Sequence, residues 1–164
     1  MRVAGFDVST RKLDCVLVDL DDLEPPVWIS FDFSVGADAW ERCRTVAQVV
    51  NGRAFWEEWG LYAAGVEMPF GYSSAQVAMV IGVLLTRLPP DILIERWANN
   101  SWRKAVGLRG AGSTKERKRT SVEKSTGLLA EAGVTHVDSW TIDAHEAHLI
   151  AVATRGALTG KVEQ

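Results

Sequence analysis

The order of the predicted secondary-structure elements constrains the fold of this chain more than any other feature. Three runs rich in Val, Leu, Ile and Phe come first, separated by short turns or loops, which predicts three consecutive strands. In the third run, Val27, Ile29, Phe31 and Phe33 alternate with other residues, as is typical of a strand with one buried face. Helical periodicity then alternates with two more short apolar runs. This order predicts an α/β fold, a mixed sheet that opens with antiparallel strands and carries helices on both faces.

The element boundaries follow from the changes of periodicity and from capping signals. Ser113 followed by Glu116 resembles a capping box, which places a helix start at Thr114. We expect strands at residues 2–8, 12–20, 27–34, 61–67 and 91–97. We expect helices at residues 37–60, 73–87, 99–106, 114–132 and 142–154. The chain has 164 residues and no repeat or linker, so we expect one domain over residues 1–164.

Two carboxylates stand in runs that should be buried. Asp7 lies between Phe6 and Val8 in the first predicted strand, and Glu67 ends the apolar run before Met68. A carboxylate in such a place needs compensation for its lost hydration. Either acid alone can point outward at a strand end or pair with an arginine. Two carboxylates on the sheet of one small core suggest that they share a function.

A second pair of acids opens the last predicted helix. Asp143 and Glu146 are three residues apart, so they lie about 60° apart on one helical face. Favourable interaction with the helix dipole is an alternative reason for acids at this position. The same geometry turns His145 and His148 away from Asp143, which favours exposed or packed imidazoles over metal ligands.

Four carboxylates in this order have a chemical use. Their oxygens are hard ligands suited to Mg²⁺ or Mn²⁺, and two such ions about 3.5–4 Å apart can align an attacking water with a scissile phosphate. Carboxylates with this layout are therefore suited to hold such ions, and no Cys or His needs to take part.

The charge is distributed unevenly along the chain. The formal net charge is −3, which by itself argues against a nucleic-acid partner. Between Arg96 and Lys124, however, nine basic and two acidic residues give +7, so the remainder carries −10. Such a segment is typical of a local contact with a polyanion, although a solvated helix face is the alternative.

These residues resemble the RuvC-type Holliday junction resolvases of the ribonuclease-H-like superfamily. The resemblance rests on residues 5–7 (Gly-Phe-Asp), residues 66–70 (Val-Glu-Met-Pro-Phe) and residues 143–147 (Asp-Ala-His-Glu-Ala), and the order of elements also matches over nearly the whole chain. It implies that Asp7, Glu67, Asp143 and Glu146 are metal ligands and catalytic residues. It also implies a lysine near the scissile phosphate, for which Lys115 is our choice and Lys118 the competitor.

The resemblance further implies DNA contacts and an aromatic that stacks on an unpaired base. The implied DNA-binding residues are Phe70, Arg103, Lys104, Arg109, Lys115, Arg117, Lys118 and Arg119. The alternative for Phe70 is an aromatic folded back onto the core. Four features depart from the family pattern: Arg109, the cluster at residues 117–119, Glu146, where Asp is commoner, and His145 beside it. We therefore expect Mg²⁺, with Mn²⁺ as an alternative ion.

The expected activity is paired, symmetrical nicking of four-way junctions, with flaps and forks as further branched substrates. Two cuts related by a two-fold axis call for a homodimer. The apolar helix over residues 75–85 is a candidate interface, notably Val77, Met79, Val80, Ile81 and Leu84, and a core helix is the alternative. Ribonuclease H places its second acid on the first helix, where Glu41 is followed by basic residues and looks solvent-facing. A hybrid-cleaving ribonuclease and an inactive branched-DNA-binding module remain the competing functions.

The remaining features are unremarkable for such an enzyme. Cys15 and Cys43 have no metal-binding spacing and are expected to be buried thiols. No apolar run approaches the roughly 18 residues of a membrane span, so we expect a cytosolic protein without membrane contact. The unusual loop is consistent with a bacteriophage origin, in which case the location is the host cytoplasm.

Overall fold

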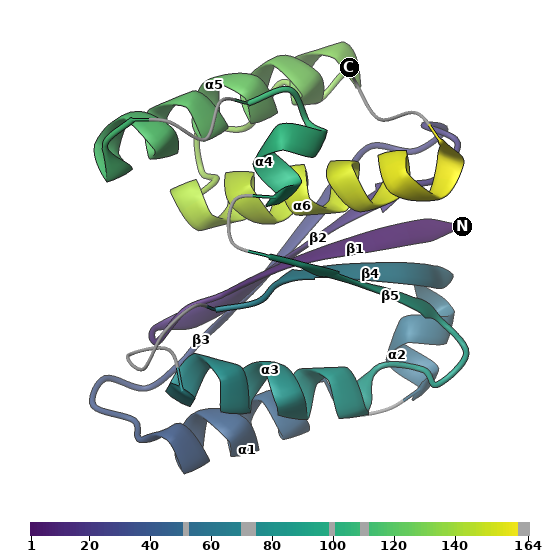
Figure 1. The fold of residues 1–164 in the computed structure, drawn as a ribbon. Helices are drawn as coiled ribbons and strands as arrows, with labels where there is room; N and C mark the ends of the chain where they lie inside the picture. The colour runs from purple at the N-terminus through teal and green to yellow at the C-terminus, as the bar shows by residue number, and fades with distance from the viewer. Residues whose placement is uncertain (51–52, 70–74, 99–100, 109–111, 161–164) are drawn as a thin grey trace.

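The structure is a computed structural model that describes residues 1–50, 53–69, 75–98, 101–108 and 112–160. Five strands form one sheet, and helices lie on both of its faces (Figure 1). The strands are β1 (Arg2–Val8), β2 (Lys12–Asp19), β3 (Val27–Asp32), β4 (Leu61–Glu67) and β5 (Leu93–Trp97). The helices are α1 (Ala39–Val49), α2 (Arg53–Glu58), α3 (Ala75–Arg87), α4 (Ser101–Ala105), α5 (Thr114–Glu131) and α6 (Ile142–Thr159).

The sheet is mixed, with strand order β3-β2-β1-β4-β5. β1 pairs antiparallel with β2, which pairs antiparallel with β3, while β1, β4 and β5 run parallel. The carboxyl ends of β1 and β4 therefore meet at the same edge of the sheet, beside the amino end of β2. This arrangement confirms the predicted α/β class.

The two faces of the sheet carry different cores. α1, α2 and α3 cover one face, where Phe6, Leu13, Trp56 and Leu84 are buried in the larger cluster (Figure 1). α4, α5 and α6 lie on the other side, and α6 packs directly on the sheet through small residues such as Ala147 (Figure 1). Both predicted thiols are buried.

Two predicted helices differ from those observed. Residues 37–60 form two helices instead of one, because Asn51 and Gly52, which lie outside the described residues, have low helix propensity. The last helix continues five residues beyond the predicted end, through Gly156 to Thr159, and ends at Gly160, whose φ of 70° is left-handed.

The candidate dimer helix is largely a core helix. Val80, Ile81 and Leu84 of α3 are buried in the core cluster, as the core-helix alternative predicts, and Met79 is 39% exposed. None of the helices in the described part of the chain combines the length and apolar character that a membrane crossing requires.

Candidate metal centre

Alternation along the strands places three acids on the face covered by α6. On β1, Val3 packs with Ala147 and Ala151 of α6, so Asp7, four residues on, points to the same face. Asp14 of β2 lies directly opposite Asp7 in the ladder. Glu67 ends β4 one strand away. The sheet thus brings the carboxyl groups to one edge, beneath the start of α6.

Two glycines let α6 lie unusually close to the sheet. A Cβ at Gly5 would stand 2.0 Å from the backbone oxygen of Ala147, and one at Gly65 would stand 2.0 Å from Thr154 Oγ1. Any larger residue at either position would push the helix away. The close approach carries the first turn of α6 down to the carboxyl end of β1.

The predicted helical pair meets Asp7 at this point. One carboxylate oxygen from each of Asp7, Asp143 and Glu146 lies within 4.8 Å of the others. Thr141 begins α6 by accepting a hydrogen bond from the Ala144 amide, which fixes the turn that presents Asp143. The structure therefore brings together three of the four predicted ligands.

Glu67 stands beside this group and has its own partner. Its Oε2 accepts a hydrogen bond of 2.9 Å from Nε1 of the buried Trp102 on α4. It is near enough that its charge contributes to raising the pKa values of Asp7 and Glu146. All four predicted acids thus lie at one edge of the sheet.

Asp7 is the least compensated of these acids. Burial, followed by the charges of Glu146, Asp143, Glu67 and Asp14, raises the pKa of Asp7 well above its usual value. Among the described residues, no hydrogen bond or ion pair reaches its carboxyl group. A carboxylate with these neighbours is stabilised by gaining either a proton or a cation.

Glu146 is held by a residue that we had predicted to contact DNA. Arg103 of α4 is 5% exposed, and its guanidinium forms an ion pair with Glu146 while donating to Ser121 Oγ at 2.8 Å. Burial raises the pKa of Glu146, and the charges of Arg103 and Lys118 partly offset that effect. The structure therefore corrects the assignment of Arg103: its charge is directed inward at a candidate ligand, not outward at a phosphate.

Asp143 faces two lysines from different elements. Lys118 Nζ of α5 lies 3.7 Å from one carboxylate oxygen, and Lys12 Nζ of β2 lies 3.4 Å from the other. Lys12 also forms a tighter ion pair, 2.7 Å long, with the fully buried Asp14. These contacts orient Asp143 without covering it, since its side chain is still 25% exposed to solvent.

The donor set fits a divalent cation. In the described part of the chain, five carboxyl groups at this edge face the three basic side chains of Lys12, Arg103 and Lys118, so negative charge remains in excess. The excess is centred on Asp7, whose donors are the hard oxygens that Mg²⁺ and Mn²⁺ prefer. A bound divalent ion would compensate the buried charge that the protein's own groups leave unpaired.

The two histidines of α6 are packed inside the protein. The Nδ1 atoms of His145 and His148 lie 2.8 and 2.9 Å from the same hydroxyl, Ser125 Oγ of α5. Burial, followed by the charge of His145, lowers the pKa of His148 to about 3, and burial also lowers that of His145. Because one hydroxyl can donate to one ring and accept from the other, the pair is neutral and internally satisfied. Both rings are therefore packed, which is one of the two alternatives to metal ligation that the helical geometry predicts.

The basic segment lies along the same side as the acids. Lys104 of α4 and Lys115 of α5 are exposed, and Lys118 is half-buried beside Asp143. Arg119 is exposed and pairs with Glu123, while Arg117 is half-buried. Phe70 and Arg109 lie outside the described residues. Of the predicted DNA contacts that the structure describes, Lys104, Lys115 and Arg119 are therefore exposed, Arg119 being paired with Glu123, and Lys118 lies beside an acid of the cluster.

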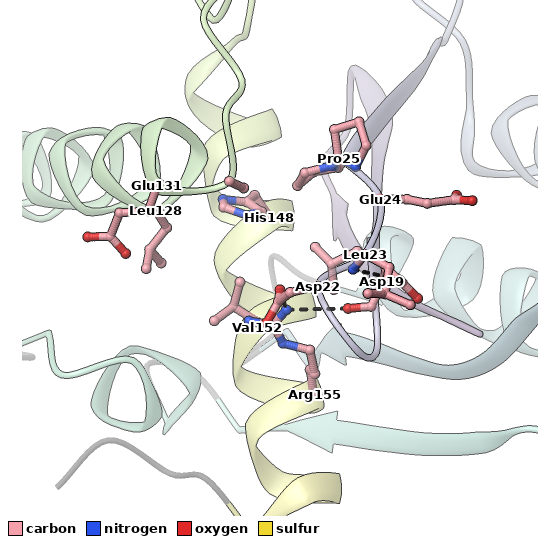
Figure 2. A pocket seen from close by; sticks show the side chains of 13 residues that line it. Asp19, Asp22, Leu23, Glu24, Pro25, Leu128, Glu131, His148, Val152 and Arg155 are labelled. Carbon is pink, nitrogen blue, oxygen red and sulfur yellow. Dashed lines mark hydrogen bonds and ion pairs between the residues drawn. The ribbon is translucent and has the colours of Figure 1, made fainter.

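A separate cavity of about 370 Å³ lies on the other flank of α6 (Figure 2). His148 and Val152 line one wall, and the loop after β2 lines the other. Arg155 at its base forms an ion pair with Asp22 and donates to the backbone oxygen of Asp19. Because that charge is already used, the cavity lining offers no cationic group free to bind an anion among the described residues.

Sequence reasoning missed the groups that support the acids. Lys12, Asp14, Trp102 and Ser121 were not singled out. For Asp14 a signal was present, since it interrupts an apolar strand between Leu13 and Cys15 just as Asp7 interrupts the first. The partners of Glu67 and Glu146 carry no such signal, because each contact joins segments far apart in the sequence.

Comparison with known proteins gives matches in structure alone. No family model and no curated protein matches the chain. The structure of Thermus thermophilus RuvC matches with a TM-score of 0.69 and 18% identity, covering 98% of both chains. The fowlpox virus resolvase, solved with substrate Holliday junction DNA, matches with a TM-score of 0.64 and 12% identity, covering 96% of this chain and 99% of that chain. The yeast mitochondrial Holliday junction resolvase Ydc2 matches at 0.62 and 11%, covering 94% and 78%.

These likenesses extend over nearly the whole chain while sequence identity is low. The protein therefore has the ribonuclease-H-like α/β fold in its RuvC-type form, as its resemblance to those resolvases predicted. A fold of this kind hosts more than one chemistry, so the activity has to be argued from the acid cluster itself.

Proposed function

We propose that this protein is a divalent-metal-dependent endonuclease that resolves branched DNA. The observation that carries the proposal is the half-buried Asp7 carboxyl, which has no hydrogen-bond or ion-pair partner among the described residues and lies beside Asp143 and Glu146. The fold adds support, since the fowlpox virus and yeast neighbours are Holliday junction resolvases, and T. thermophilus RuvC and the fowlpox enzyme were both solved with a Holliday junction substrate. The acid cluster and the fold are both needed for the proposal. Clusters of acidic residues often bind no cation, and the fold alone does not specify the substrate.

Asp7, Glu67, Asp143 and Glu146 would hold Mg²⁺ or Mn²⁺, with two ions as the proposed number. Bound there, the metal would supply an activated water and charge stabilisation at the phosphate. The protein's own part is to keep the ligands in place. Arg103 fixes Glu146, and Trp102 fixes one oxygen of Glu67. Asp7 has no such partner among the described residues, so its charge would be compensated by the bound cation.

Basic groups beside the acids are proposed to bind the DNA backbone. Lys118 stands 3.7 Å from Asp143, so a phosphate at the acid cluster would lie within reach of its ammonium group. Lys115, one helical turn earlier, and Lys104 on α4 are exposed. Lysines so placed can offset charge that develops on the phosphate during cleavage. Lys115 and Lys118 are both proposed for this part, with Phe70 and Arg109 as further contacts.

A homodimer is proposed on geometric grounds. A four-way junction is resolved by two cuts related by a two-fold axis, and two protomers would place two acid clusters in that relation. The products would be nicked duplexes with 5′-phosphate and 3′-hydroxyl ends that a ligase can seal.

The test compares substrates and a matched variant. Purified protein is incubated with Mg²⁺ or Mn²⁺ and a synthetic four-way junction, a flap, a linear duplex or an RNA/DNA hybrid, beside Asp7→Asn and the control Asp91→Asn, an exposed acid before β5. We expect symmetrical nicks in the junction, lost in Asp7→Asn and kept in the control. Preferential cleavage of the hybrid would identify a ribonuclease instead. Tight junction binding without nicking would identify a binding module, and either result would refute the proposal.

A further inference from the structure

Lys12 occupies a position that the proposed reaction does not account for. It lies on β2, next to the carboxyl end of β1, and its side chain is only 16% exposed. Its ammonium group contacts three oxygens: Asp14 Oδ2 at 2.7 Å, Thr141 Oγ1 at 2.7 Å and Asp143 Oδ2 at 3.4 Å. Two of the three belong to the start of α6. Lys12 therefore joins the sheet to the helix that carries Asp143.

Asp14 is the anchor of this contact. Its side chain is fully buried, and Trp28 Nε1 of β3 donates a hydrogen bond of 2.8 Å to its other oxygen. Trp28 in turn lies against Trp140, one residue before Thr141, with ring centroids 5.8 Å apart. Lys12 is thus held by a buried carboxylate, and the half-buried partner of that carboxylate, Trp28, packs against the residue before the α6 cap.

The placement of Asp14 is unfavourable for stability alone. It faces Asp7 directly across the β1–β2 ladder, where like charges repel, and its charge contributes to raising the pKa of Asp7. A buried ion pair seldom stabilises more than an apolar pair of the same size. The advantage of Lys12 with Asp14 therefore lies in where the ammonium group is placed.

Lys12 is also unsuited to a phosphate contact. The ammonium group of Lys12 already donates a hydrogen bond to Thr141 Oγ1 and forms ion pairs with Asp14 and Asp143, and only 16% of the side chain is exposed. Lys118, by comparison, keeps 44% of its side-chain exposure and approaches Asp143 only at 3.7 Å. Of the two lysines at Asp143, Lys118 is the one placed to meet DNA, and Lys12 is the one that is fixed.

We infer that Lys12, anchored on Asp14, is a positioning residue that holds the Asp143 carboxylate and the Thr141 cap of α6 in the geometry required for a divalent ion. The inference rests on the proposed function, because it takes Asp143 to be a metal ligand. Lys12 acts through Asp143 and does not touch the substrate. Its fixed charge sets the direction of one Asp143 oxygen and leaves the other side of the carboxylate to the ion and Lys118.

The test removes the contact without changing the net charge. In Lys12→Gln/Asp14→Asn, one positive and one negative charge disappear together, and the amide oxygen introduced by Asp14→Asn can still accept the Trp28 hydrogen bond. Mn²⁺ is titrated into the DNA-free protein by calorimetry, and single-turnover junction cleavage is measured at saturating Mg²⁺. Groups that orient metal ligands typically change affinity or activity about 10–100-fold, and we expect a loss of that size in both measurements. Arg11→Gln, which removes an exposed charge one residue away, is the control and should change neither.

A thermal melt confirms that each variant is folded. If the double variant does not fold, Asp14→Asn alone, which weakens the anchor and keeps Lys12, should show a smaller shift in the same direction. Two results would overturn the inference. The first is a Mn²⁺ dissociation constant of the folded variant within about threefold of wild type, a change well below the loss expected for a group that orients a ligand. The second is weaker junction binding with unchanged Mn²⁺ affinity. If wild type binds Mn²⁺ but cleaves no junction, the proposed function fails, and the Mn²⁺ titration still decides the role of Lys12.

Discussion

At the Asp7 carboxyl group, burial and charge act in the same direction. Removal from water, followed by four neighbouring acids, raises the pKa of this group. The folded pKa therefore lies above the unfolded value of about 4. Such a group destabilises the folded state fully above its folded pKa, and the effect disappears as the pH falls below the unfolded value. Without metal, the protein thus loses stability as the pH rises through this window.

Asp7→Asn should therefore stabilise the metal-free protein at neutral pH. We expect a gain of roughly 0.5–2 kcal/mol, the range common when a strained functional residue is relieved. Thermal melts with a chelator should show the gain at pH 7 and its disappearance near the unfolded pKa of about 4. Added Mg²⁺ should raise the melting temperature of wild type and leave that of Asp7→Asn unchanged. A variant less stable than wild type at pH 7 without metal would show that Asp7 is compensated in some other way.

Among the elements, α6 decides whether the acids meet. It lies on β1 and β4 at the glycines Gly5 and Gly65, where a Cβ would collide with the helix. Two carboxylates on the first turns of α6 reach the sheet only because of this close approach. Gly5 and Gly65 are thus needed both for the packing of the core and for bringing the acids of the candidate site together.

Gly5→Ala should move or destabilise α6. The added methyl group would stand 2.0 Å from the Ala147 oxygen, and overpacking of this kind typically costs about 1–3 kcal/mol. Chemical denaturation should show the loss, and Mn²⁺ affinity should fall with it. Gly82→Ala in α3 is the control: its Cβ meets nothing within 4 Å, and alanine should stabilise that helix by roughly 0.5–1 kcal/mol. Equal effects of the two substitutions would rule out the close approach as the cause.

Much of this arrangement could be predicted from the sequence, and the reason is local. Asp7 and Glu67 stand out because they interrupt or end apolar strands, and Asp143 and Glu146 because their spacing matches a helical face. Periodicity also gave β4 its observed bounds. The burial of Arg103 could not be predicted, since an arginine in a basic segment looks the same whether it faces solvent or Glu146, 43 residues later. The Lys12 contact with Asp143 spans even more of the chain.

For the whole molecule, acidic and basic surface groups differ in where they lie along the sheet. Asp21, Glu24, Glu57 and Glu58 line a cavity beside the amino end of β1, whereas Lys118 of α5 lies beside Asp143 near its carboxyl end. The low net charge therefore conceals a molecule with two unlike surfaces. Such a distribution directs a polyanion to the acid cluster and away from the other end.

Lys104→Ala and Lys115→Ala should each weaken junction binding and reduce its dependence on salt. Loss of one phosphate contact lowers the slope of log K against log salt by about 1. Binding can be measured in Ca²⁺ to suppress cleavage, at several salt concentrations. Arg87→Ala, an exposed cation at the end of α3 on the opposite face, should leave the slope unchanged. If Arg87 changes the slope and the two lysines do not, the DNA lies on the other face.

The most direct test of the metal centre is anomalous diffraction from crystals of the protein soaked in Mn²⁺. The account predicts an anomalous peak within coordination distance, about 2.0–2.3 Å, of an Asp7 oxygen, with Asp143, Glu146 or Glu67 among the other ligands. The peak should be absent in Asp7→Asn. A Mn²⁺ ion bound elsewhere, or a cluster that stays empty at saturating Mn²⁺, would contradict the claim that these four acids form a metal centre.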